Sequence, residues 1–154
     1  MKKAQSIYAL YGAGDTGKTT TLTKLKGKIE EITDPICVIE RGEDFSAMFD
    51  IKGQKVAIIS AGDNEEEIHT GLKSLDGYGP FDILFCASRT RGQTTHYLIN
   101  MFEGQNLRWV DNMSISDGKD EHNQQEKRQK QIDLCNEAVA SFLFQSLLVE
   151  VVAS

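Results

Sequence analysis

The chain contains little proline and cysteine, and no long apolar run free of charge. Its 154 residues include two prolines, three cysteines and one tryptophan, and hydrophobic residues make up 40%. This composition is typical of a globular protein rather than a disordered one, and the length suits a single domain. Every 18-residue window carries a charge, and polar Gln5 and Ser6 follow Lys2 and Lys3 closely. We therefore expect neither a membrane span nor a signal peptide.

The cysteines and the net charge exclude further classes. Cys37 and Cys86 lie in strand-like runs and Cys135 in a helical segment, without the spacing of a metal site. We expect buried free thiols in a reducing compartment, which predicts a cytoplasmic protein. The formal net charge of −6 makes nucleic acid an improbable partner, because such surfaces carry concentrated positive charge.

One segment carries a chemical pattern. Residues 12–19 read Gly-Ala-Gly-Asp-Thr-Gly-Lys-Thr, which matches G-x-x-x-x-G-K-[ST] in full. Gly12 and Gly17 allow backbone angles closed to other residues, so that successive N–H groups can point at phosphate oxygens. In this pattern Lys18 reaches the β- and γ-phosphates, and the Thr19 hydroxyl binds Mg²⁺.

The flanking segments suit this interpretation. Residues 6–11 form an apolar run that predicts a strand, and from Thr20 a helix is predicted with Leu22, Leu25, Ile29 and Ile32 on one face. A helix that begins at the glycine loop points its partial positive charge at a bound anion. The residues expected to contact the nucleotide are Gly12, Ala13, Gly14, Asp15, Thr16, Gly17, Lys18, Thr19 and Thr20.

The rest of the chain alternates between strands and helices. Strands are predicted at 36–39, 56–59, 83–87 and 107–110, and helices at 64–75, 93–102 and about 121–153, while 41–55 has a mixed pattern. This alternation predicts an α/β fold: a parallel sheet of about five strands with helices on both faces, and ligands at the carboxyl ends of the strands. Polar residues follow several strand ends: Glu40, Asp63, Ser88 to Arg91, and Asp111.

The last helix admits two interpretations. Its second half carries apolar residues all round, from Val139 to Val152. It could be a core helix packed on the sheet, or it could also form an interface with a protein partner or a second copy. Asp133, Glu137 and Glu150 argue against a membrane helix.

Residues 12–19 resemble the Walker A loop of the P-loop NTPase superfamily, and the predicted element order around them agrees with a three-layer sandwich of that kind. Residues 17–22 are similar to the loops of signal-recognition-type GTPases and of several nucleotide kinases. Residues 56–62 resemble the D-x-x-G switch of GTPases, but Ile59 stands in place of its aspartate. Residues 88–91 replace the guanine-reading N/T-K-x-D, and Ala13 replaces the extra lysine of partitioning ATPases. The resemblance therefore implies Mg²⁺ and ATP rather than GTP.

A Mg²⁺ site in this superfamily needs a second carboxylate. Asp63 is the first choice and Glu40 the alternative, although either could be a solvated strand-end carboxylate or a helix cap. Arg89 and Arg91 are placed like the lid arginines of P-loop kinases, which neutralise the transferring phosphoryl group. Together with Lys18 they are the predicted catalytic residues; otherwise they are surface arginines.

Three functions follow from these residues. The first is an ATPase-type module in which the nucleotide state controls a partner. The second is a small P-loop kinase, with a nucleotide or another small acceptor held near residues 40–44 and the arginines, although 154 residues leave little room for an acceptor pocket and a lid. The third is a nucleotide-binding structural subunit with little hydrolysis.

Overall fold

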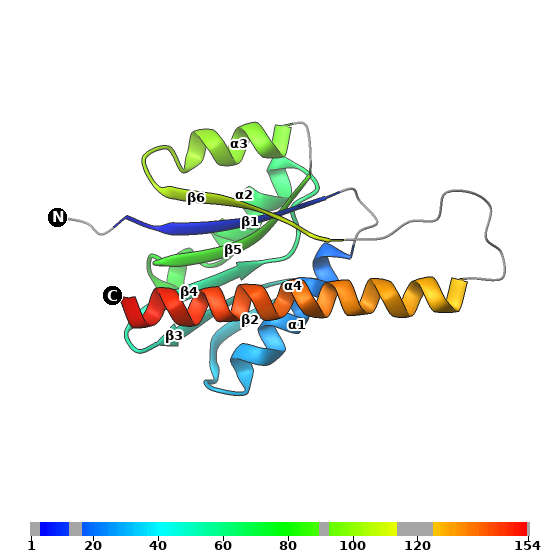
Figure 1. The fold of residues 1–154 in the computed structure, drawn as a ribbon. Helices are drawn as coiled ribbons and strands as arrows, with labels where there is room; N and C mark the ends of the chain where they lie inside the picture. Colours follow the sequence, from blue (N-terminus) through cyan, green and yellow to red (C-terminus); the bar gives the residue numbers. More distant parts are fainter. Residues whose placement is uncertain (1–3, 13–16, 90–92, 114–124, 154) are drawn as a thin grey trace.

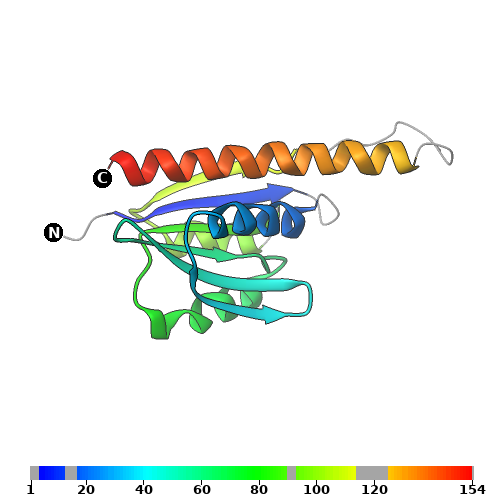
Figure 2. The same cartoon turned by 90° about the horizontal axis from the view of Figure 1, so that it is seen from below.

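The computed structural model describes residues 4–12, 17–89, 93–113 and 125–153. Within these ranges the chain forms one sheet of six strands with helices packed on both faces (Figures 1 and 2). The elements in order are β1 (Ser6–Gly12), α1 (Lys18–Glu30), β2 (Pro35–Arg41), β3 (Asp44–Ile51), β4 (Gln54–Ile59), α2 (Glu65–Ser74), the short 3₁₀ helix η1 (Asp76–Tyr78), β5 (Ile83–Arg89), α3 (Gln93–Met101), β6 (Asn106–Asp111) and α4 (Gln125–Ala153).

The sheet is mixed, in the order β2-β3-β4-β5-β1-β6. Strands β4, β5, β1 and β6 are parallel neighbours, whereas β2, β3 and β4 pair antiparallel. The α/β class is confirmed, but the expectation of a purely parallel sheet of about five strands was wrong. The difference lies in residues 41–55, where the mixed pattern contains the whole of β3.

Two tight hairpins explain why β3 was missed. Two residues connect β2 to β3, the first being Gly42 with φ 64°, and two more connect β3 to β4, Lys52 and Gly53, with φ 52° and 86°. Two-residue loops with positive φ match the twist of antiparallel strands. Lys52 is not a residue that favours this conformation, so the turn signal for the second hairpin is weak.

Each face of the sheet has its own core. Helices α1 and α4 cover one face and α2 and α3 the other. Of the predicted stripe on α1, Leu22, Leu25 and Ile29 are buried, as expected, but Ile32 is exposed because α1 ends at Glu30. The thiols of Cys86 and Cys135 are buried and free, and Cys37 is half-buried. Burial raises the pKa of the Cys86 thiol to about 12, which keeps it protonated and unreactive.

Helix α4 packs on the sheet, which confirms the interpretation of a core helix. Its inner face contributes Val139, Leu143, Leu147 and Val151 to the core beside α1. Polar contacts join it to α1 and to β1. The Glu137 carboxylate pairs with the ammonium groups of Lys24 and Lys28, and the Glu150 carboxylate accepts hydrogen bonds from the Ser6 and Tyr8 hydroxyls.

The opposite face of α4 carries large apolar side chains in solvent. Leu134, Phe142, Val149 and Val152 are between 56% and 77% exposed. By length and composition alone, the stretch Glu126–Val152 would also pass as a membrane span, a property it shares with core helices of soluble proteins. Figures 1 and 2 show that the first turns of α4 extend past the end of the sheet.

Candidate functional site

The candidate site lies where the parallel strands β1, β4 and β5 end and α1 begins. A pocket of about 330 Å³ opens there, which we call the loop pocket. Of the predicted nucleotide contacts, Gly17 to Thr20 line it, and Gly12 ends the adjacent strand; Ala13, Gly14, Asp15 and Thr16 lie outside the described residues, as does Arg91. The loop pocket is lined by residues 17–20, 43–44, 60–63, Glu67 and Ala87.

Lys18 is buried at the floor of this site. Its side-chain Nζ donates hydrogen bonds to the carbonyl oxygen of Gly12 at 2.9 Å and to that of Ser88 at 2.7 Å. Because Gly12 is the last residue of β1 and Ser88 the last but one of β5, the ammonium group joins two neighbouring strands at their carboxyl ends. Burial lowers the pKa of Lys18, the charge of Asp63 raises it and that of Arg89 lowers it. A bound anion would favour the charged form of the lysine.

Gly17 precedes α1 in a conformation reserved mainly for glycine. Its φ is 81°, and a Cβ at this position would lie 2.6 Å from the Asn136 Nδ2 on α4. The Asn136 side chain is buried, and its Oδ1 accepts a hydrogen bond from the Thr21 hydroxyl, which also donates to Asn112 Oδ1. Gly17 therefore lets α4 and the loop after β6 pack directly against the start of α1.

The carboxylate beside Thr19 was not predicted from the sequence pattern. The Thr19 hydroxyl donates to Asp44 Oδ1 at 3.1 Å, and the Ser60 hydroxyl donates to the same oxygen at 2.9 Å. Asp44 begins β3, which runs antiparallel to β4, so the start of β3 lies beside the carboxyl end of β4. The glycines of the two hairpin loops, Gly42 and Gly53, were the signal that could have predicted β3 and with it the position of Asp44.

Asp63 lines the loop pocket and forms an ion pair with Arg89. Arg89 Nε is 3.8 Å from Asp63 Oδ1, and both side chains are more than half exposed, so the ion pair itself adds little stability. Glu40, the alternative carboxylate, lies on the edge strand β2 opposite Phe45 and does not line the loop pocket. The structure thus brings Asp63 and Arg89 together near Lys18 and leaves Glu40 away from them.

Gly62, the glycine of the segment that resembles a GTPase switch, has a packing role. A Cβ at this position would lie 1.9 Å from the carbonyl oxygen of Ala87, so the loop after β4 can cross β5 only without a side chain there. Ser60, two residues before Gly62, is 2% exposed, and its backbone N–H donates a hydrogen bond to the carbonyl oxygen of Phe45. Close packing alone therefore requires this glycine.

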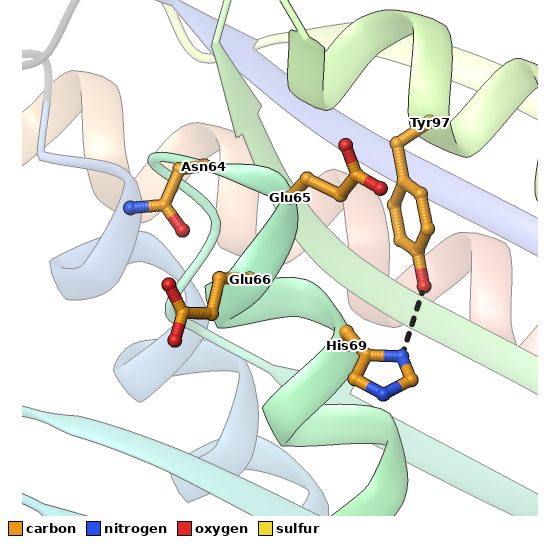
Figure 3. Close-up of a pocket in the computed structure, with 5 residues that line it drawn as sticks. All are labelled: Asn64, Glu65, Glu66, His69 and Tyr97. Atoms are coloured by element: carbon orange, nitrogen blue, oxygen red, sulfur yellow. Dashed lines mark hydrogen bonds between the residues drawn. The ribbon is translucent and has the colours of Figure 1, made fainter.

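A second pocket opens between α2 and α3, away from the glycine loop. Figure 3 shows its lining, Asn64, Glu65, Glu66, His69 and Tyr97, and the 3.4 Å contact between the Tyr97 hydroxyl and His69 Nδ1. Its acidic residues form the first turn of α2, where they suit the helix dipole, and the Asn64 side chain caps this helix by accepting from the Glu67 N–H. The start of α2 thus accounts for these polar residues: Asn64 caps the helix, and the glutamates interact with its dipole.

The loop pocket combines groups that suit an anion with groups that suit a hard cation. The start of α1 and the Lys18 ammonium suit phosphate oxygens, and Thr19 and Asp44 offer oxygen ligands. Among the described residues no three His, Cys, Asp or Glu side chains form a metal cluster, so a cation here would need oxygens from phosphate and water. Comparison of the chain with protein-family models, curated proteins and solved structures finds no match.

Proposed function

We propose that this chain binds a magnesium nucleoside triphosphate in the loop pocket and acts as an ATPase-type module. One observation carries the proposal. Lys18 and Thr19 of the glycine pattern stand together at the start of α1, with the lysine buried at the ends of β1 and β5 and the threonine bonded to Asp44. A chance match to the glycine pattern would not require these two side chains to lie in this arrangement. The resemblance to P-loop NTPases points the same way.

In this proposal each group has one role. The backbone N–H groups at the start of α1 and the Lys18 ammonium bind phosphate oxygens. Thr19 and Asp44 hold Mg²⁺, which keeps several waters and the phosphate oxygens as its other ligands. Ser60 orients the Asp44 carboxylate through its hydrogen bond. Asp63 stays the alternative carboxylate. ATP is proposed over GTP because the guanine-reading residues are missing after the strand at 83–89.

Replacing Lys18 with alanine should weaken ATP binding by roughly ten- to a hundredfold, because a charge-assisted hydrogen bond contributes about 1.5–3 kcal/mol. Calorimetric titration of wild type, Lys18→Ala and the control Lys73→Ala measures this, with GTP as the competing nucleotide. Lys73 is a lysine of α2 outside the loop pocket. Equal ATP affinity of wild type and Lys18→Ala would refute the proposed site, and a tenfold preference for GTP would refute the choice of base.

Asp44→Asn should raise the Mg²⁺ concentration needed for half-maximal ATP binding by roughly tenfold, while ATP binding without metal changes little. The amide keeps the size and hydrogen bonding of the side chain but removes the charge that attracts the cation. Mg²⁺ titrations of ATP binding to Asp44→Asn, Asp63→Asn and Glu40→Gln compare the three carboxylates. If only Asp63→Asn changes the Mg²⁺ dependence, the metal carboxylate is Asp63 and not Asp44.

A small kinase is the second candidate, favoured by the ion pair of Arg89 with Asp63, which lines the loop pocket. An arginine there could stabilise charge that develops on the γ-phosphoryl oxygens during transfer. Arg89→Ala should lower turnover by roughly ten- to a thousandfold with ATP affinity nearly unchanged. The control is Lys73→Ala on α2, outside the loop pocket and the proposed acceptor segment. The same effect on turnover is predicted for Arg91→Ala, at a position outside the described residues.

Turnover of ATP with and without a panel of nucleoside monophosphates separates the three functions. Phosphate release without acceptor supports the ATPase module, and stimulation with a phosphorylated product supports the kinase. Tight binding without turnover supports a structural subunit. Wild-type turnover of Arg89→Ala would make Arg89 an ordinary surface residue.

We also propose that the outer face of α4 binds a second copy of the chain. Exposed positions recur at steps of three and four along this face: Leu134, Ala138, Phe142, Gln145, Val149 and Val152. No charged residue interrupts the series. An antiparallel two-fold pairing would place Leu134 opposite Val152, Ala138 opposite Val149 and Phe142 opposite Gln145, so the stripe is complementary to itself.

Phe142→Glu should then weaken self-association by roughly tenfold or more, because it places a charge at the centre of an apolar contact. Sedimentation velocity over a range of protein concentrations measures the effect. Ile99→Glu is the matched control, since Ile99 is an exposed apolar residue on α3. A wild-type protein that stays monomeric throughout that range, or equal effects of both substitutions, would exclude pairing through α4.

A further inference from the structure

An aromatic pair lies beside the loop pocket but outside both cores. Trp109 on β6 lies opposite Ala9 of β1, and Tyr11 is two residues further along β1, so both side chains are on the α3 side of the sheet. Their ring centroids are 6.4 Å apart and the ring planes are inclined by 76°. With Arg89 and Thr95 they line a pocket of about 270 Å³, which we call the aromatic pocket.

The other aromatic pairs serve the core. Tyr8 stacks on Phe85 within the core under α1 and α4, and Phe81 packs edge-on against Phe102 in the core under α2 and α3. Trp109, in contrast, is 38% exposed and belongs to neither core. An exposed tryptophan and a tyrosine in one pocket form a surface suited to a flat, partly polar ring.

Arg89 connects the aromatic pocket to the loop pocket. It lines the aromatic pocket, and its Nε approaches Asp63, which lines the loop pocket. Gly12, the first glycine of the pattern, lies opposite Arg89 in the β1–β5 register, and Tyr11 directly precedes it. A molecule with its ring against Tyr11 and Trp109 would therefore have its phosphate groups near Gly12 and Arg89.

We propose that the aromatic pocket binds the base of a nucleotide. Its volume lies just below the range of about 300–1,000 Å³ of pockets that hold drug-sized ligands, which suits one ring system rather than a whole cofactor. One of the two aromatic faces stacks on the base while the other ring contacts the edge of the base, and the Arg89 guanidinium contributes a cation–π contact or binds a phosphate. This deepens the proposed function, on which it rests. The base belongs either to the triphosphate in the loop pocket or to a second nucleotide.

The only tryptophan in the chain reports on this pocket directly. We expect AMP and ATP to change the fluorescence of Trp109 and inorganic triphosphate, which has no base, to bind without that change. Tyr11→Leu should weaken ATP and AMP binding about five- to a hundredfold, the range for loss of one base-stacking partner, and leave triphosphate affinity unchanged. Tyr78→Leu is the matched control, an exposed tyrosine of η1 outside both pockets.

Each outcome decides one question. Equal effects of Tyr11→Leu on ATP and on triphosphate, or no effect on either, would overturn the aromatic pocket as a base site while triphosphate binding keeps the proposed function. Triphosphate that fails to bind wild type would refute the proposed function, and AMP titration would still test the aromatic pocket. AMP that changes Trp109 fluorescence in protein saturated with triphosphate identifies a second nucleotide; AMP excluded by triphosphate identifies the base of the loop-bound nucleotide.

Discussion

The arrangement of the candidate site depends on the buried ammonium group of Lys18. Burying a charge is costly unless it is hydrogen-bonded. Lys18 meets that condition with the carbonyls of Gly12, the last residue of β1, and Ser88, the last but one of β5. Strands β1 and β5 and the first turn of α1 are thereby held at one point. The same group is the one that the proposed phosphate site requires. The contact that orders the strand ends and the contact that would bind an anion therefore involve a single side chain.

The antiparallel extension of the sheet gives the site its second half. A strand that continued the parallel pattern would begin at the opposite edge, and its first residue would lie far from Thr19. Because β3 returns beside β4, its first residue, Asp44, lies where β4 ends, and Ser60 bonds to it there. The oxygen ligands proposed for Mg²⁺ thus come from a helix start and from the start of an antiparallel strand.

Periodicity and turn residues predicted most elements but not all of the site. Strands β1 and β5, predicted at 6–11 and 83–87, and the helices that follow them were predicted because apolar residues recur with a clear period. Strand β3 was not, since Lys52 stands before Gly53 in its hairpin where Asn or Asp would have given the usual turn signal. Missing β3 also meant missing Asp44. The buried pair Asn112 and Asn136 could not be predicted either, because their contact with Thr21 joins segments 91 and 115 residues apart.

Helix α4 is anchored at both ends of strand β1. Asn136 lies against the start of α1 where β1 ends, and Glu150 bonds to Ser6 and Tyr8 where β1 begins. Fourteen helical steps cover about 21 Å, and six strand steps cover about 20 Å, so the two elements match in length. Hydrogen bonding to Glu150 adds to burial in raising the pKa of Tyr8 to about 12. Inserting or deleting one residue of α4 between these anchors would rotate one anchor by about 100° away from its contact. The helix therefore tolerates substitution on its outer face far better than any change in its length.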